Sequence, residues 1–194
     1  WRHDYGRALA YSERALDHMI QAGDRVTVSL VLANLAELRC KLGLFTHAEH
    51  ALAFGKQVIG PGMPPAVSAS FGVTGARLAL IRGNTGEASR EIQRVISQPR
   101  SAISAEAYLV ATRIALEDGN LARARDHISC AQEIASTDKI RAEVALLSAY
   151  LARAEGVPYL ELAEQALAQA RAAGEEELLR EVHMLLFDQY RANN

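Results

Sequence analysis

The 194-residue sequence contains few aromatic residues, few prolines and only two cysteines. Aromatic residues make up 6% of the chain, and no run alternates β-branched with polar residues, so a fold built on a sheet is disfavoured. Cys40 and Cys130 stand alone without CxxC spacing, which disfavours a disulfide framework and a zinc site. We therefore expect a cytoplasmic protein that holds no metal and no other cofactor.

An excess of basic charge and a long apolar run are also missing. The formal net charge is −2, which lacks the basic footprint of a protein that binds nucleic acid directly. No apolar run approaches the roughly 18–20 residues that a membrane helix needs. Hydrophobic residues nevertheless make up 49% of the chain, enough to form a packed core. We expect an all-α protein that contacts neither nucleic acid nor membrane.

A repeated pattern organises the chain. In each copy a long apolar-periodic run ends in glycine, and a second, shorter run with an early alanine follows. The glycines are Gly43, Gly83, Gly119 and Gly156, spaced 40, 36 and 37 residues apart. Glycine ends a helix by adopting the left-handed conformation, and alanine lets the two helices of a hairpin approach closely. Because each hairpin alone leaves an apolar face bare, neighbouring hairpins must stack.

The breaks between periodic runs predict ten helices. They are expected at residues 5–22, 25–43, 45–59, 65–83, 86–97, 101–118, 121–135, 138–155, 158–173 and 175–191.

The cores Gly43–Ala48, Gly83–Ala88 and Gly119–Ala124 make the chain resemble the tetratricopeptide repeat family. The resemblance implies one domain over 1–194, folded as a right-handed α-α superhelix of about ten antiparallel helices. The copies lack the family's tryptophan and proline, and their long period resembles the arrays of large bacterial signalling and transcriptional regulators. The implied function is a scaffold that binds a protein or peptide and performs no catalysis. The alternative is a sensor of a peptide or small molecule that controls an attached effector domain.

In this family the first helix of each hairpin lines the concave groove. Counting back from the glycines places polar residues at equivalent inner positions. The candidate partner-binding residues are Asn34, Glu37, Arg77, Arg113, Tyr150 and Arg153. Arginines on successive repeats suit an acidic or amphipathic segment. The alternative is that these arginines pair with local acids, namely Glu37, Glu106, Glu117 or Glu143.

Motifs for other chemistry are weak. His47 and His50 share a helical face, but a structural zinc site needs four ligands and no second pair is visible. The stretch from Gly83 to Gly86 lacks the lysine of a phosphate-binding loop. We expect neither catalytic nor metal-binding residues.

The first helix, 5–22, resembles the second helix of a hairpin whose first helix is missing. The chain also begins without methionine, which suggests a fragment of a larger protein. The apolar side chains of this helix, including Leu9, Leu16 and Ile20, then require either further repeats upstream or a homodimer through this helix.

Overall fold

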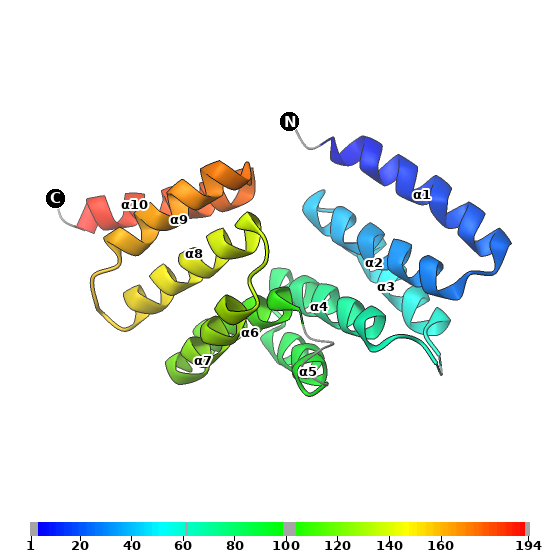
Figure 1. The fold of residues 1–194 in the computed structure, drawn as a ribbon, viewed down its shortest axis with the longest axis horizontal. Helices are drawn as coiled ribbons and strands as arrows, with labels where there is room; N and C mark the ends of the chain where they lie inside the picture. Colours follow the sequence, from blue (N-terminus) through cyan, green and yellow to red (C-terminus); the bar gives the residue numbers. More distant parts are fainter. Residues whose placement is uncertain (1–3, 61, 99–103, 193–194) are drawn as a thin grey trace. The chain divides into compact units, whose positions relative to one another are not determined.

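The computed structural model describes residues 4–60, 62–98 and 104–192, and within these ranges it contains ten α-helices and no strand (Figure 1). The helices are α1 (Tyr5–Ala22), α2 (Arg25–Lys41), α3 (Phe45–Val58), α4 (Pro65–Ile81), α5 (Thr85–Ile96), α6 (Ala105–Glu117), α7 (Leu121–Glu133), α8 (Asp138–Ala154), α9 (Leu160–Ala173) and α10 (Glu176–Ala192). The all-helical class is confirmed, as is the predicted number of helices in the described ranges.

The chain divides into two compact units. Unit 1, Trp1–Ile103, holds α1 to α5, in which α2 packs with α3 and α4 packs with α5. Unit 2, Ser104–Asn194, holds α6 to α10, in which α6 packs with α7 and α8 packs with α9. The long helix α8 is the centre of unit 2, because it contacts α6, α7, α9 and α10. The single domain over residues 1–194 stays a prediction.

The repeat glycines end their helices in one common way. Gly119 has φ +69° and donates its N–H to the Leu116 carbonyl at 3.1 Å, while Asn120 donates to the Ala115 carbonyl at 2.8 Å. The same two bonds, three and five residues back, occur at the other three repeat glycines. Glycine suits this place because a side chain is strained at positive φ. The predicted helices extended to or next to each glycine, whereas the observed helices end two residues before it, since the capping glycine itself lies outside the helix.

Side chains cap the starts of several helices. Asn84 and Asn120, directly after their glycines, accept hydrogen bonds from the backbone N–H of Glu87 and Arg123. Ser104 accepts from the Ala107 N–H at 3.3 Å, so α6 begins at Ala105. The prediction began this helix at residue 101, and residues 101–103 lie outside the described ranges.

The repeat alanines lie where the helices of each hairpin meet. All four are 0% exposed, which confirms the close approach that the repeat predicts. They are Ala48, Ala88, Ala124 and Ala163.

Two glycines inside helices of unit 1 permit still closer packing. A Cβ at Gly55 would lie 2.0 Å from Cε1 of Phe71, a ring that is 1% exposed in the core of α2, α3 and α4. A Cβ at Gly72 would lie 2.4 Å from Cγ2 of Val95. The backbones of α3 and α4 therefore serve as packing surfaces for large side chains of their neighbours.

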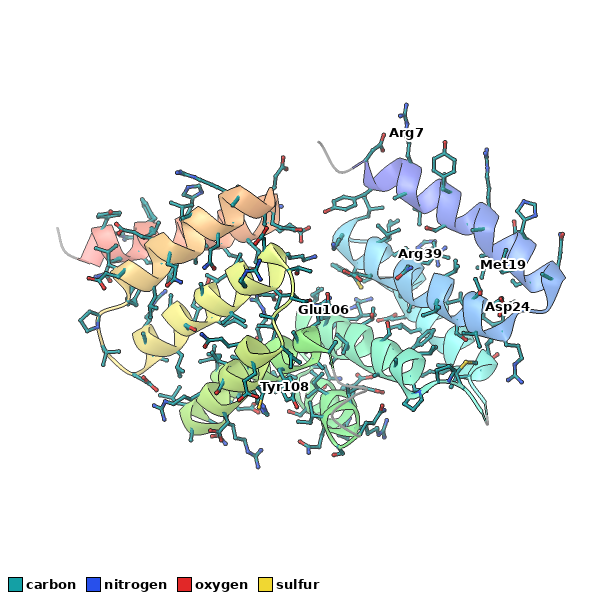
Figure 2. The ribbon with its side chains drawn as sticks, viewed as in Figure 1. Arg7, Met19, Asp24, Arg39, Glu106 and Tyr108 are labelled. Atoms are coloured by element: carbon teal, nitrogen blue, oxygen red, sulfur yellow. The ribbon has the colours of Figure 1, made fainter. Side chains whose placement is uncertain are left out.

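The first helix packs more loosely than the others. No residue of α1 is fully buried in the described chain, although Leu16 and Met19 pack against the core of unit 1. Figure 2 labels Met19 on α1 and Arg39 on α2. Nη2 of Arg39 on α2 donates a hydrogen bond to Oε1 of Glu13 on α1 at 3.0 Å. Tyr11 and Ile20 remain 68% and 47% exposed, so α1 still carries the bare apolar surface on which the predicted homodimer depends.

Candidate binding groove

A groove of about 480 Å³ runs between α6 and α8 of unit 2. Its lining residues are Arg113, Leu116, Glu117, Leu147, Tyr150, Arg153 and Ala154. Leu116, Leu147 and Tyr150 supply an apolar floor, and charged groups border it. Three of the six candidate residues predicted from the repeat alignment, Arg113, Tyr150 and Arg153, thus lie together.

Arg113 stands at the centre of a charged triad. Its Nη1 donates to Glu181 Oε2 on α10 at 3.1 Å, and its Nη2 donates to Glu143 Oε1 on α8 at 3.4 Å. The Glu143 side chain is only 12% exposed, so it relies on this arginine for its counter-charge. Burial by itself lowers the pKa of Arg113, but Glu143 and Glu181 together raise that pKa above its usual value. The guanidinium therefore stays charged and fixes α6, α8 and α10 together.

The other two candidate residues in the groove, Tyr150 and Arg153, are more accessible to solvent than Arg113. Burial, and then the charge of Glu181, raise the pKa of the Tyr150 phenol, which keeps its hydroxyl as a hydrogen-bond donor. Arg153 pairs with Asp188 on α10 at 3.1 Å, with both side chains about half exposed. Such an exposed pair is screened by water and contributes little to stability.

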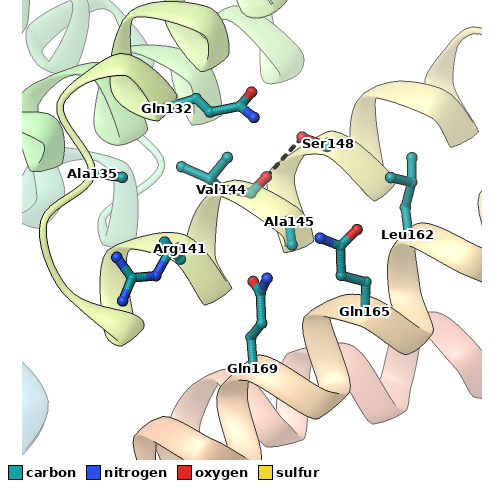
Figure 3. A pocket seen from close by; sticks show the side chains of 9 residues that line it. All are labelled: Gln132, Ala135, Arg141, Val144, Ala145, Ser148, Leu162, Gln165 and Gln169. Carbon is teal, nitrogen blue, oxygen red and sulfur yellow. Dashed lines mark hydrogen bonds between the residues drawn. The ribbon is translucent and has the colours of Figure 1, made fainter.

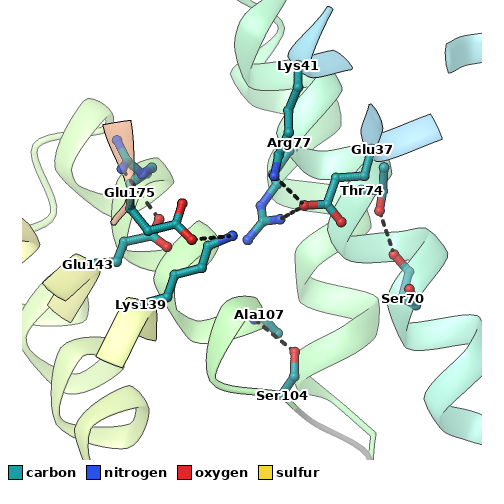
Figure 4. A network of polar contacts seen from close by, with 11 residues as sticks. Glu37, Lys41, Ser70, Thr74, Arg77, Ser104, Ala107, Lys139, Glu143 and Glu175 are labelled. Atoms are coloured by element: carbon teal, nitrogen blue, oxygen red, sulfur yellow. Dashed lines mark hydrogen bonds and ion pairs between the residues drawn. The ribbon is translucent and has the colours of Figure 1, made fainter. Parts of the chain in front are cut away.

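The remaining candidates lie in unit 1. Asn34 is exposed on α2. Glu37 lies between Lys41, at 3.5 Å, and Arg77 on α4, at 3.7 Å (Figure 4). Glu37 and Arg77 are thus brought together, as residues on neighbouring first helices of two hairpins.

Both inner arginines therefore pair with acids. Arg77 pairs with Glu37 and Arg113 with Glu143, two of the four local acids that the sequence offered as the alternative. The alignment missed Glu181, because α10 precedes no repeat glycine on which it could be aligned. Glu181 comes near Arg113 because α10 packs against α8, a contact that the repeat pattern does not predict.

The local charge of the groove follows from these pairs. Two arginines face four carboxylates, those of Glu117, Glu143, Glu181 and Asp188. The guanidinium groups of Arg113 and Arg153 are consequently paired within the protein and do not form a free basic stripe. These carboxylates would repel a strongly acidic partner. The apolar face of a partner would instead pack on the apolar floor of the groove.

The histidines and cysteines that could bind a metal or react do not form a site. His47 and His50 are exposed on α3, and no group of three metal-ligating side chains gathers anywhere in residues 4–60, 62–98 and 104–192. Cys40 is half-buried, and burial raises the pKa of its thiol, which favours the unreactive neutral form. Within the same ranges no helix has the length and apolar character needed to cross a membrane.

No protein-family model, curated protein or solved structure matches this chain significantly. The resemblance to tetratricopeptide repeat proteins therefore stays a prediction that depends on the repeat itself.

Proposed function

We propose that this chain is a helical-repeat scaffold of the tetratricopeptide-like type, a right-handed superhelix of hairpins that binds a segment of another protein. Four hairpins with the same glycine cap and the same buried alanine support the repeat architecture. The observation that carries the function is the open, apolar-floored groove between the first helices of two successive hairpins, α6 and α8.

The groove favours an amphipathic segment over an acidic one. The partly exposed side chains of Leu116 and Tyr150, together with exposed Ala154, offer an apolar surface that one face of a partner helix would cover. The carboxylates around the floor favour basic residues at the edges of that helix, because like charges across an interface are costly.

A second function, sensing a small ligand, is favoured by a different observation. A cavity of about 290 Å³, lined by both apolar and polar side chains, lies between α7, α8 and α9. A ligand there would contact helices of two successive hairpins and bias how they pack.

A substitution that places a large side chain in the groove tests whether a partner binds there, and it leaves the ion pairs around the groove intact. Ala154 is exposed at the end of α8 and lines the groove, whereas Ala172 is exposed at the end of α9 and does not. Arginine is tolerated at both places because a cation favours the C-terminal end of a helix. A phage-displayed library of random dodecapeptides is selected on the whole chain, and the affinities of the selected peptides are measured by fluorescence anisotropy.

We expect the selected peptides to carry apolar residues three and four positions apart. Ala154→Arg should weaken their binding about tenfold or more, while Ala172→Arg should leave it within about twofold. Peptides that bind both variants equally well would show that the partner site lies elsewhere, and a selection that yields no binder would count against the scaffold function.

A further inference from the structure

A second opening in unit 2 has a different chemistry from the groove (Figure 3). It measures about 290 Å³ and is bounded by α7, α8 and α9. Gln132 on α7 and Gln165 and Gln169 on α9 extend toward it, and Ser148 on α8 also lines it. Its apolar surface comes from Ala135, Val144, Ala145 and Leu162.

One amide in this cavity lacks a hydrogen bond. Oε1 of Gln169 is buried and has no partner within the described chain. A buried polar atom without a partner is costly, and such atoms are rare in folded proteins. No N–H or O–H group of the described residues donates a hydrogen bond to this oxygen. Ser148 offers no donor either, since its hydroxyl already donates to the Val144 carbonyl at 2.8 Å.

The charge of the cavity is also balanced. Arg141 lies at its edge, and its guanidinium is paired with Asp138. No carboxylate occurs among the described residues that line the cavity. The groups left to recognise a ligand are therefore three uncharged amides and the oxygen of Ser148.

We propose that this cavity binds the amide group of a small neutral ligand. Each glutamine amide presents an acceptor oxygen beside a donor NH₂, and an amide in the ligand presents the complementary pair. The ligand N–H would donate to Gln169, and its carbonyl would accept from a neighbouring glutamine. The cavity approaches the size of small-molecule pockets and exceeds by several fold the roughly 30 Å³ that one water occupies.

This site is independent of the groove. Val144, Ala145 and Ser148 lie on one side of α8, whereas Leu147, Tyr150 and Ala154 lie on the other, as the 3.6-residue helical period requires. The amide has two chemical sources, a free small molecule or the main chain of a peptide, and the length of the probe separates them.

The test uses NMR titration of the whole chain with three probes. The first is N-acetylalanine N-methylamide, which carries two amides. The second is its methyl ester analogue, in which an oxygen replaces one N–H. The third is a capped hexapeptide of alternating glycine and serine. The readout is the side-chain NH₂ resonances of Gln132, Gln165 and Gln169.

We expect the first probe to shift these resonances with a dissociation constant on the order of 1–10 mM, as suits so small a ligand. The ester should bind several fold more weakly because it has one N–H donor fewer than the diamide. Gln169→Leu should weaken binding about tenfold without loss of helicity, since it replaces an unpaired polar atom by an apolar group. The matched control is Gln57→Leu, an exposed glutamine on α3, which should leave the titration unchanged.

The outcomes decide the proposal. Tighter binding of the hexapeptide identifies a peptide main chain as the source, and equal or weaker binding identifies a free small molecule. The absence of shifts with every probe, or equal binding by Gln169→Leu and the native chain, would show that the cavity holds only water and would overturn the proposal. Neither result bears on the groove, whose test uses other residues.

Discussion

Arg113→Leu is expected to lower the free energy of unfolding of unit 2 by about 2–4 kcal/mol, because it leaves the carboxylate of Glu143 buried without a counter-charge. Glu181, which is 38% exposed, would turn to water and contribute less to the loss. The measurement is urea denaturation followed by circular dichroism at 222 nm. The comparison variant Arg153→Leu removes an exposed pair and should cost less than about 1 kcal/mol.

A double variant separates the buried charge from other effects of the substitution. Arg113→Leu combined with Glu143→Leu removes both charges and should recover most of the lost stability, since apolar residues often replace a buried ion pair without loss. A single variant as stable as the native chain would show that Glu143 is hydrated, and would contradict the role assigned to the triad.

The triad also affects how the groove is studied. Arg113→Glu would place a third carboxylate beside Glu143 and Glu181, so a loss of partner binding in that variant would report unfolding as much as a lost contact. Ala154→Arg avoids this difficulty because Ala154 is exposed.

Gly55→Ala is expected to destabilise unit 1 by about 2–3 kcal/mol. The added methyl would lie 2.0 Å from Cε1 and 2.3 Å from Cζ of Phe71, a buried ring with little room to move. This overlap outweighs the roughly 0.5–1 kcal/mol by which alanine favours a helix over glycine. Thermal and urea unfolding of the variant measure the effect.

The matched control is Gly75→Ala on α4. There the nearest atom to the added methyl is Cγ of Glu91 at 4.0 Å, so the helical preference of alanine acts alone and should stabilise the chain by about 0.5–1 kcal/mol. Effects of the same sign at both glycines would mean that the ring of Phe71 does not rest on the backbone of α3.

The local signals of the sequence predicted the helices well. Glycine at the helix ends and asparagine after it act on their own few residues, through backbone conformation and short-range hydrogen bonds. The predicted starts at 5, 25, 45, 65, 121 and 138 agree with the observed ones, and the side chains of Asp4, Asp24, Asn120 and Thr137 cap four of them. The buried repeat alanines followed from the same local pattern, because three of them lie five residues after the glycine and the fourth, Ala163, lies seven residues after it.

Local signals did not predict the contacts between helices that are far apart in the sequence. Gly55 and Gly75 are both glycines inside helices, and nothing in their neighbouring residues distinguishes the one that supports Phe71 from the one that faces open space. Arg113 and Glu181 are 68 residues apart, and Gln132 and Gln169 face one cavity from two helices on either side of α8. The sequence by itself determined the helical class, the repeat and, to within two residues, the ends of most helices, since these depend on neighbours along the chain. Only the tertiary structure decided which arginines are neutralised and where the groove and cavity open, because charge pairing and empty volume depend on which helix faces pack together.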